Sequence, residues 1–427
     1  MKHTEWIDRL NSGALNEKLS ALYGGEQSIL DAQRRRFIRA LARFDEIFPG
    51  RDDIRLFSAP GRSEIGGNHT DHQRGCALAA AVNLDVIAVV AFHEEGVIRV
   101  FSEGYYLSEV SLDDLGVHSE EKGGSISLIR GIAARFARMG VHIGGFDAYT
   151  TSDVLSGSGL SSSAAFETLV GTIIDAGCNN SRAGAVEIAK IGQYAENVYF
   201  GKGSGLLDQT VCAVGGFVFL DFQDAENPVV VQHDFDFEAA GYRLCITDTK
   251  GSHADLTGEY TAVPAEMKSV ERCFGKDVLR EVDEQAFFDA IPSLRGRVGD
   301  RAILRALHFF GENRRAALEA DALARGDLKA FFRYYRESAD SSANLLQNLY
   351  AAQKPQEQGI PLAIAVSKRI LGAAGAVRVH GGGFAGTIQA FVPTDKTEAY
   401  RKEMDALFGQ GSCHVLRVRP AGGISII

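Results

Sequence analysis

The chain has 427 residues, of which 45% are hydrophobic and 23% are charged, and its formal net charge is −10. A globular chain of this length supplies core for about two to three domains, so a deep cleft between domains is available. The acidic balance, with no basic run longer than the RRR at residues 34–36, argues against a nucleic-acid partner.

The apolar and cysteine patterns indicate an intracellular protein. The N-terminal segment MKHTEWIDRLNSGALNEKL lacks the apolar core of a secretory signal. The longest apolar run, CALAAAVNLDVIAVVAF, is interrupted by Asn83 and Asp85 and is too short and too polar to span a bilayer. The six cysteines are scattered without a CxxC spacing, as reduced thiols are. We therefore expect a cytoplasmic protein with no disulfides and no membrane partner.

The first half of the chain is predicted to be rich in strands. Apolar residues recur at helical spacing from Leu30 to Phe48, and β-branched or aromatic runs then predict strands at IRLF, VIAVVAF, VIRVFS and YLSEVSL. Further on, GFDAYTTSDV reads as another strand. Helical spacing predicts three helices, at about residues 125–139, 161–176 and 182–200.

The pattern changes after GGFVFLDF, near residues 215–225. A strand YRLCITDTK is followed by four to five helical segments between about Pro264 and Leu371, and then by two strands, AVRVH and TIQAFVP, on either side of a glycine cluster. Strands and helices come in blocks, which predicts an α+β fold. We expect two domains that pack closely, residues 1–220 and residues 221–427.

The first motif, APGRSEIGGNHTDHQRG at residues 59–75, crowds glycines, charges and hydrogen-bonding groups into one bend after the strand IRLF. Glycines let backbone approach a ligand closely, and side chains of this kind supply hydrogen bonds and charge. The alternative is a polar loop that is held by an ion pair between an arginine and a carboxylate.

The second motif, SDVLSGSGLSSSAAFE at residues 152–167, leads from a strand into an Ala-rich helix. Backbone N–H groups and the positive end of the helix would face the loop, which is how phosphates are held in many proteins. An ordinary Ser-capped helix start is the alternative. The chain contains no GxxxxGK[ST] sequence, so the segment is not a Walker A loop.

The third motif, VRVHGGGFAGTIQAFVP at residues 377–393, fits GxGxxG formally through Gly381, Gly383 and Gly386. A dinucleotide site requires a helix after the glycines, whereas TIQAFV is a strand pattern, so we set an oxidoreductase aside. Two strands joined by three glycines bring backbone close to a ligand phosphate or to another chain segment, unless the loop is a simple bulge.

A fourth segment, YAENVYFGKGSGLLDQ at residues 194–209, carries two acids, Glu196 and Asp208, among apolar neighbours. An unpaired buried carboxylate is costly. Asp208 is therefore either a helix cap or a carboxylate held in a site by a cation, for which Arg62 is the candidate.

Taken together and in this order, the motifs PGRSEIGGNHTDH, GSGLSSSAA and GGGFAG resemble the signatures of the GHMP kinases. The first is similar to the galactokinase form GRVNLIGEHTDY, and GLLDQ and the GEY at residues 258–260 resemble further galactokinase segments. The resemblance implies a two-lobed α+β fold, with an N-terminal lobe like ribosomal protein S5 domain 2 and a ferredoxin-like C-terminal lobe. It also implies transfer of a phosphoryl group from Mg²⁺-bound ATP to the anomeric C1 hydroxyl of galactose.

The resemblance also implies roles for single residues. Asp208 matches the catalytic aspartate and Arg62 its cationic partner, and Ser163 and Glu196 match the Mg²⁺ ligands. The implied sugar-binding residues are Asn68, His69, Asp71, Gly205 and Tyr260. The implied ATP phosphate loop consists of Gly157, Ser158, Gly159, Leu160, Ser161, Ser162 and Ser163.

The first motif departs from the family pattern at several positions, with His72 in place of the family tyrosine among them. Asn68 replaces the family glutamate, which contacts the sugar toward O6, and Glu64 replaces the family asparagine. An amide repels a C6 carboxylate less than Glu does, so a kinase for galacturonate, arabinose or N-acetylgalactosamine is an alternative. A sugar- and ATP-binding sensor without transferase activity is another, although the intact motifs argue against it. We expect a monomer or a weak homo-oligomer.

Overall fold

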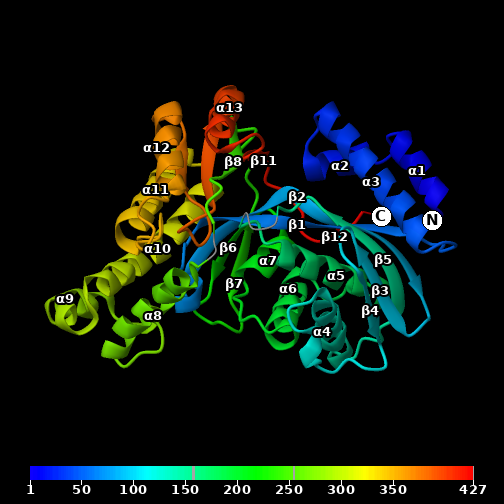
Figure 1. Ribbon diagram of the computed structural model, residues 1–427, viewed down its shortest axis with the longest axis horizontal. Helices are drawn as coiled ribbons and strands as arrows, with labels where there is room; N and C mark the ends of the chain where they lie inside the picture. Colours follow the sequence, from blue (N-terminus) through cyan, green and yellow to red (C-terminus); the bar gives the residue numbers. More distant parts are fainter. Residues whose placement is uncertain (156–158, 253–254, 427) are drawn as a thin grey trace.

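The larger of two sheets is built from both ends of the chain (Figure 1). The computed structural model describes residues 1–155, 159–252 and 255–426. The sheet has eight strands, with β12-β1-β2-β5-β3-β4 side by side, β6 on β2, and β7 on β6. Its strands are β1 (Arg55–Gly66), β2 (Cys76–His93), β3 (Val97–Ser102), β4 (Leu107–Ser111), β5 (Gly145–Ser152), β6 (Phe217–Asp221), β7 (Val229–His233) and β12 (Ile424–Ser425).

Strand β1 runs farther than the sequence predicted. IRLF does lie at its start, but the strand continues through Gly66, so that the first motif begins in the sheet and bends only from Gly67 onward. The pairing of β1 with β2 shifts register between Pro60 and Arg62 and again between Glu64 and Gly66. Such bulges re-aim side chains. The prediction that the whole motif is one bend was therefore wrong.

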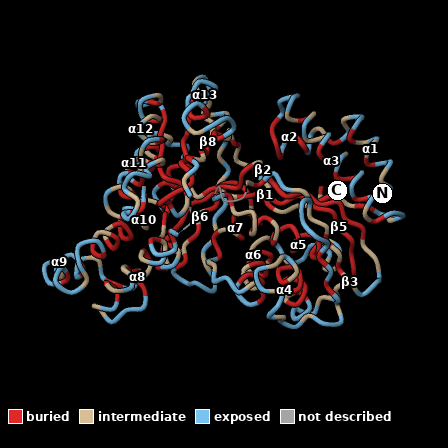
Figure 2. The backbone as a smooth tube through the Cα atoms, viewed as in Figure 1, coloured by how far each residue is buried: buried red, intermediate tan, exposed pale blue. Residues whose placement is uncertain are grey.

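Both faces of the larger sheet are covered by helices. Residues of β2 alternate between two cores: Ala88 and Val90 pack toward one, and Ile87 and Val89 toward the other. This period of two is that of a strand buried on both faces. Helices α4 (Ser125–Arg138), α5 (Ser162–Cys178), α6 (Ala185–Tyr194) and α7 (Leu207–Val214) cover one face, and α1 (His3–Asn11), α2 (Asn16–Tyr23) and α3 (Gln27–Ile47) the other. Figure 2 shows the strands buried between these layers.

The smaller sheet has four antiparallel strands in the order β11-β8-β10-β9. They are β8 (Tyr242–Asp248), β9 (Ala376–Val379), β10 (Thr387–Pro393) and β11 (Cys413–Leu416). The helices of this part are α8 (Thr257–Cys273), α9 (Glu284–Val298), α10 (Asp300–Ala324), α11 (Leu328–Ser341), α12 (Gly359–Leu371) and α13 (Thr397–Phe408). The predicted helical region is confirmed, but α8 starts earlier and runs through Pro264. The sequence pattern missed α1, α2 and α13.

The chain crosses between its two parts more than once. After residue 220, β7 still pairs with β6, and the C-terminal β12 pairs with β1 through Phe57 opposite Ser425. Helix α10 packs on β2 as well as on its own neighbours. A division of the chain near residue 220 therefore stays a proposal, and such a division has to place β7 and β12 with the N-terminal part.

Asp85 ties the N-terminal helices and the C-terminal segment to β2. The carboxylate of Asp85 is fully buried and accepts hydrogen bonds from Tyr23 Oη at 2.5 Å, Arg36 Nη1 at 2.6 Å and Arg419 Nη1 at 3.0 Å. Burial by itself would raise the pKa of Asp85, but the two guanidinium groups outweigh it and hold the pKa below its usual range. Three segments far apart in sequence are thus bound to one charge.

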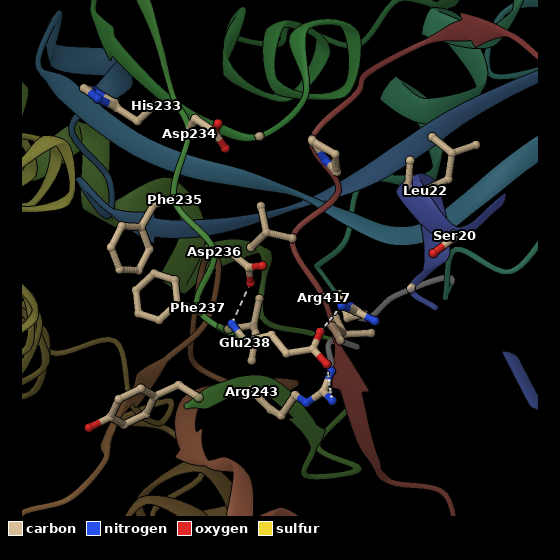
Figure 3. A pocket seen from close by; sticks show the side chains of 18 residues that line it. Ser20, Leu22, His233, Asp234, Phe235, Asp236, Phe237, Glu238, Arg243 and Arg417 are labelled. Carbon is tan, nitrogen blue, oxygen red and sulfur yellow. Dashed lines mark hydrogen bonds and ion pairs between the residues drawn. The ribbon is translucent and has the colours of Figure 1, made fainter. Parts of the chain in front are cut away.

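A cavity of about 270 Å³ lies where α2, residues 233–238, β8 and the C-terminal segment meet (Figure 3). The carboxylate of Glu238 forms ion pairs with both Arg243 and Arg417 in its wall. These ion pairs match the charges in the wall and bind the segment of residues 233–238 to β8 and to the C-terminal segment. None of the predicted site residues that the structure describes lines this cavity.

Within the described parts of the chain, no helix has both the length and the apolar character needed to cross a bilayer.

Replacing Asp85 with Asn is expected to lower the free energy of unfolding by about 3–5 kcal/mol, since it leaves buried guanidinium charges uncompensated. The matched control is Asp31→Asn on α3, where an exposed carboxylate pairs with Arg34 at one-turn spacing and contributes about 0.5 kcal/mol or less. Urea denaturation at pH 7 measures both. Equal effects of the two changes would contradict the role of Asp85.

Candidate active site

The centre of the site is an ion pair between Arg62 on β1 and Asp208 in the first turn of α7. Arg62 Nε lies 2.7 Å from Asp208 Oδ1, and Arg62 Nη2 lies 2.6 Å from Asp208 Oδ2. This bidentate geometry is the strong form of an arginine–carboxylate contact. The pair that the sequence suggested as one of two alternatives is present.

Asp208 is held ionised although it is partly removed from water. About a third of its side chain (32%) is exposed. Burial would raise the pKa of the carboxyl, but the charge of Arg62 and hydrogen bonds from Arg62 and the Ser161 hydroxyl hold the pKa below its usual range. A carboxylate of this kind can accept a hydrogen bond from a substrate hydroxyl at neutral pH, while the guanidinium beside it stabilises negative charge.

The second motif packs against β1 through backbone contacts. The Arg62 guanidinium donates to the carbonyl of Gly159, and the Arg62 backbone N–H donates to the carbonyl of Leu160 at 3.0 Å. A Cβ on Gly61 would lie 2.7 Å from that Leu160 oxygen, so the close approach requires glycine. Ser162 and Ser163 open α5 behind Ser161. The predicted phosphate residues Gly157 and Ser158 lie outside the described residues.

The third motif lies against the first. The carbonyl of Gly381 accepts from Asn68 Nδ2 at 2.7 Å, that of Gly382 lies 3.1 Å from His69 Nε2, and that of Gly383 accepts from Tyr260 Oη at 2.8 Å. The sequence analysis gave a ligand phosphate or another chain segment as the partner of this loop. In the structure, the loop contacts another chain segment. The strand predicted after the glycines is also confirmed, as β10.

Asn68 is committed to contacts inside the protein. Only 1% of the residue is exposed. Its Nδ2 donates to Glu64 Oε1 at 2.8 Å as well as to Gly381, and its Oδ1 accepts from Asn348 Nδ2 at 2.9 Å. The amide that replaces the family glutamate is thus bonded to the carboxylate that replaces the family asparagine. The pair keeps one carboxylate and one amide with the two groups exchanged.

The remaining predicted sugar residues lie around the same loops. A Cβ on Gly205 would lie 3.0 Å from Asp71 Oδ2, so the segment before α7 passes close to this carboxylate. His69 adopts a left-handed backbone conformation with φ of 58°. Burial raises the pKa of the Tyr260 hydroxyl to about 12, which keeps it a hydrogen-bond donor at neutral pH.

Glu196 belongs to a buried cluster that the sequence did not reveal. Its Oε1 lies 2.8 Å from Lys202 Nζ, and its Oε2 accepts from Gln209 Nε2 at 2.9 Å. Gln209 Nε2 also lies 3.0 Å from Glu167 Oε2. Burial, together with the charge of Glu196, raises the pKa of Glu167 well above its usual range. Within the described residues, no group of three or more His, Cys, Asp or Glu side chains could hold a metal ion.

A cavity of about 510 Å³ opens beside the start of α5. Its walls include Ser162, Ser163 and Phe166 of α5, and the turn between β3 and β4. In that turn the side chains of Tyr105 and Tyr106 are largely exposed, at 71% and 95%. The sequence had placed Tyr106 at the start of the predicted strand YLSEVSL, whereas β4 begins at Leu107 and leaves the YY pair in the turn, where an exposed aromatic has no core to fill.

Two further residues near the first motif escaped the sequence analysis, His308 and Glu312 of α10. Both are fully buried, and both contact the backbone of residues 67–68. They stand four residues apart in HFFGEN and so share one helix face. A polar pair on a buried face was the available signal.

Comparisons with known proteins agree with this geometry. The family model described as GHMP kinases N terminal domain matches residues 127–216, and the model described as galactokinase galactose-binding signature matches residues 42–92. A galactokinase of Glaesserella parasuis is 31% identical over 352 residues, covering 81% of this chain and 86% of the relative. One of Actinobacillus pleuropneumoniae is 30% identical over 356 residues, with the same coverage.

Solved structures show the same fold. Lactococcus lactis galactokinase complexed with galactose superposes with a TM-score of 0.74 at 23% identity, covering 90% of this chain and 98% of that one. Methanococcus jannaschii mevalonate kinase gives 0.59 at 13% identity, covering 87% and 99%. The predicted two-lobed α+β fold is confirmed, and it is that of a GHMP kinase. Within this class, the chain belongs to the galactokinase family. Membership of a kinase family implies that ATP is a substrate.

Exchanging the groups at residues 64 and 68 tests the pairing of Asn68 with Glu64. Asn68→Glu alone brings two carboxylates together in a buried site, which should lower the free energy of unfolding by roughly 1–3 kcal/mol. The double variant Glu64→Asn/Asn68→Glu restores one amide and one carboxylate and should recover most of that loss. Urea denaturation of all four proteins in this cycle gives the coupling energy. A double variant no more stable than Asn68→Glu would refute the pairing.

Proposed function

We propose that the protein transfers the γ-phosphoryl group of ATP to the anomeric C1 hydroxyl of galactose, giving galactose 1-phosphate and ADP. The observation that carries this proposal is the ionised Asp208. Arg62 binds it through a bidentate ion pair, and the Ser161 hydroxyl of the second motif donates a further hydrogen bond. Membership of the galactokinase family supports the choice of sugar.

In this mechanism Asp208 accepts the hydrogen bond of the C1 hydroxyl and orients it toward the γ-phosphoryl group. Arg62 stabilises the negative charge that spreads over the transferring group. Phosphoryl transfer depends mainly on positioning and charge neutralisation, and the pair supplies both.

Recognition of the sugar is assigned to His69, Asp71, Gly205 and Tyr260. Each hydroxyl of a hexose donates and accepts a hydrogen bond, so rigid donors and acceptors can reject an epimer. The contacts of His69 and Tyr260 with the third motif support this assignment, because they hold both side chains in fixed positions.

ATP is assigned to the second motif and to the neighbouring cavity. Phosphates would bind residues 157–163, where N–H groups at the start of α5 favour negative charge. The adenine would enter the cavity beside Ser162 and Ser163 and lie against the β3–β4 turn, since aromatic side chains offer stacking surfaces to a base.

Mg²⁺ is assigned to Ser163 and Glu196, whose hydroxyl and carboxylate oxygens are the ligand type this ion prefers. Two protein ligands fit a Mg²⁺ ion that reaches the site with ATP, because such ions commonly take few protein ligands and complete their shell with phosphates and water. The bound ion would neutralise phosphate charge. Glu196 would have to exchange its contact with Lys202 for the ion.

A kinase for a related galacto-configured sugar is the second candidate. The commitment of Asn68 to Glu64, Gly381 and Asn348 favours it, since this amide is not free to act as the family glutamate does toward O6. Cytoplasmic location and a monomeric or weakly associated state are further proposals of ours.

The defining experiment is steady-state phosphorylation with Mg·ATP across galactose, arabinose, galacturonate and N-acetylgalactosamine. We expect galactose to give the highest kcat/KM, and Asp208→Asn to lower kcat by about 10²–10⁴-fold, the usual contribution of a positioned acid or base. Asp31→Asn serves as the control. A higher kcat/KM for another sugar selects the second candidate, and binding of sugar and ATP without turnover means a sensor.

A variant of the β3–β4 turn tests the adenine assignment. Tyr106→Ala is expected to raise the KM for ATP by about three- to tenfold through loss of a stacking surface, with the KM for the sugar unchanged. The matched control is Phe288→Ala, an exposed aromatic of α9 far from the cavity. An unchanged KM for ATP in Tyr106→Ala would place the base elsewhere.

A further inference from the structure

The loop that carries the predicted sugar contacts, residues 67–71, is bound from behind by helix α10. We propose that Glu312 and His308 of α10 are positioning residues, which hold the backbone of Gly67 and Asn68 and thereby set the affinity of the kinase for its sugar. The proposal rests on the proposed function, because it assigns residues 67–71 to sugar binding. The reaction itself is assigned to other residues, Asp208 and Arg62.

Glu312 binds the N–H groups of the loop. Its Oε1 accepts from the backbone N of Gly67 at 3.1 Å and of Asn68 at 3.4 Å, and also from the Ser338 hydroxyl. Its Oε2 accepts from Arg315 Nε at 2.9 Å. Each oxygen of this fully buried carboxylate therefore has a donor. Hydrogen bonds to a charged group are stronger than those between neutral groups.

The charge on Glu312 is stable at any working pH. Burial would raise the pKa of this carboxyl, but the charges of Arg378 and Arg315, that of the His308 ring when it is protonated, and the bond from Ser338 lower it to about 2. The carboxyl of Glu319, which faces the same cluster, has its pKa raised well above the usual range by burial and by Glu312. Glu312 is therefore the carboxylate of the pair, and Glu319 is the neutral acid.

His308 binds the carbonyl of the same peptide segment. Its Nε2 lies 2.9 Å from the Asn68 carbonyl oxygen, and its Nδ1 lies 2.9 Å from Ser341 Oγ. A carbonyl can only accept, so Nε2 carries the proton and Nδ1 accepts from the hydroxyl. Burial lowers the pKa of His308 to about 4, which keeps the ring neutral. Together, the two α10 side chains bind both the N–H and the C=O of Asn68.

The loop needs such an anchor because its backbone conformation is unfavourable. Gly67 has φ of 87°, and a Cβ there would lie 2.4 Å from the Cys76 carbonyl oxygen. His69 has φ of 58°, which costs a non-glycine residue roughly 1 kcal/mol or more. The backbone conformations of Gly67 and His69 determine the directions in which the His69 and Asp71 side chains point. A loop released from α10 would sample other conformations and would bind sugar only in the fraction that keeps this one.

The first test is Glu312→Gln, which keeps the shape and removes the charge. We expect the KM for the sugar to rise about tenfold to hundredfold, the effect of losing charge-assisted bonds to the loop. The KM for ATP should stay within about twofold and kcat within about threefold, since the Arg62–Asp208 pair is unaltered. Glu284→Gln, on the exposed surface of α9, is the matched control.

A second pair of variants guards against a Glu312 variant that fails to fold. The amide nitrogen of glutamine can take the place of Nε2, whereas that of asparagine reaches only the Nδ1 position. His308→Gln should therefore keep the sugar KM near that of the wild type, and His308→Asn should raise it. Equal sugar KM values for the two variants would overturn the proposal, as would parallel changes in both KM values and kcat in Glu312→Gln.

Amide hydrogen exchange separates this proposal from the proposed function. Faster exchange in the peptide spanning residues 62–74 is expected in Glu312→Gln and in His308→Asn, without any ligand present. If the wild type phosphorylates galactose but these variants keep its sugar KM, the anchor fails alone. If the wild type turns over no sugar while amide exchange is faster in the variants, the proposed function fails. The contact between α10 and the loop is then supported as a structural feature, but its assigned role in sugar affinity is overturned.

Discussion

The ion pair between Arg62 and Asp208 determines how the other parts of the site are arranged. Removing a guanidinium and a carboxylate partly from water costs hydration energy, which their attraction alone does not always offset. The fold supplies further partners: Arg62 also donates to the carbonyl of Gly159, and Asp208 accepts from Ser161. Because both partners belong to the second motif, the charge pair also fixes the part of that motif that lies just before α5. Positioning of the proposed phosphate loop is thus a consequence of satisfying one ion pair.

A second group of buried charges performs the same task for residues 67–71, the loop that we propose binds the sugar. Glu312 and Arg378 lie 3.7 Å apart inside the protein, and Glu319 stands beside them with neither carboxyl oxygen hydrogen-bonded to a described residue. Such burial is expensive, and apolar side chains would fill the space at lower cost. The position of the buried Glu319 also explains why residue 66 is a glycine, because a Cβ there would lie 1.8 Å from Glu319 Oε2. This glycine gives α10 access to the loop, whereas the sequence had suggested that the motif's glycines give a ligand access to the backbone.

The residues show which parts of this arrangement can be predicted from sequence. Hydrophobic periodicity predicted the main strands and the long helices, and the cost of an unpaired buried acid gave a cation as one of two alternatives for Asp208. Helices α1 and α2 were missed because nine and eight residues carry too few turns for a clear period. The contact of Glu312 with Gly67 joins residues 245 positions apart, and no local pattern encodes that distance. For the same reason, the contacts of Asn68 with Gly381 and Asn348 were invisible in the motif itself.

Glycine-rich motifs are commonly taken as surfaces that approach a ligand, but the third motif has a different part here. Its carbonyl groups at residues 381–383 accept hydrogen bonds from Asn68, His69 and Tyr260, so its backbone is occupied by the protein's own side chains. Without side chains of their own, these glycines expose consecutive carbonyls to the loop that carries Asn68 and His69 and to helix α8, which carries Tyr260. The third motif joins β9 and β10 of the smaller sheet, and its carbonyls bind Asn68 and His69, which follow β1 of the larger sheet. The placement of the smaller sheet therefore determines how these two side chains are oriented. Under the proposed function, recognition of the sugar depends on contacts between the two parts of the chain, and a change on either side of that boundary alters the same site.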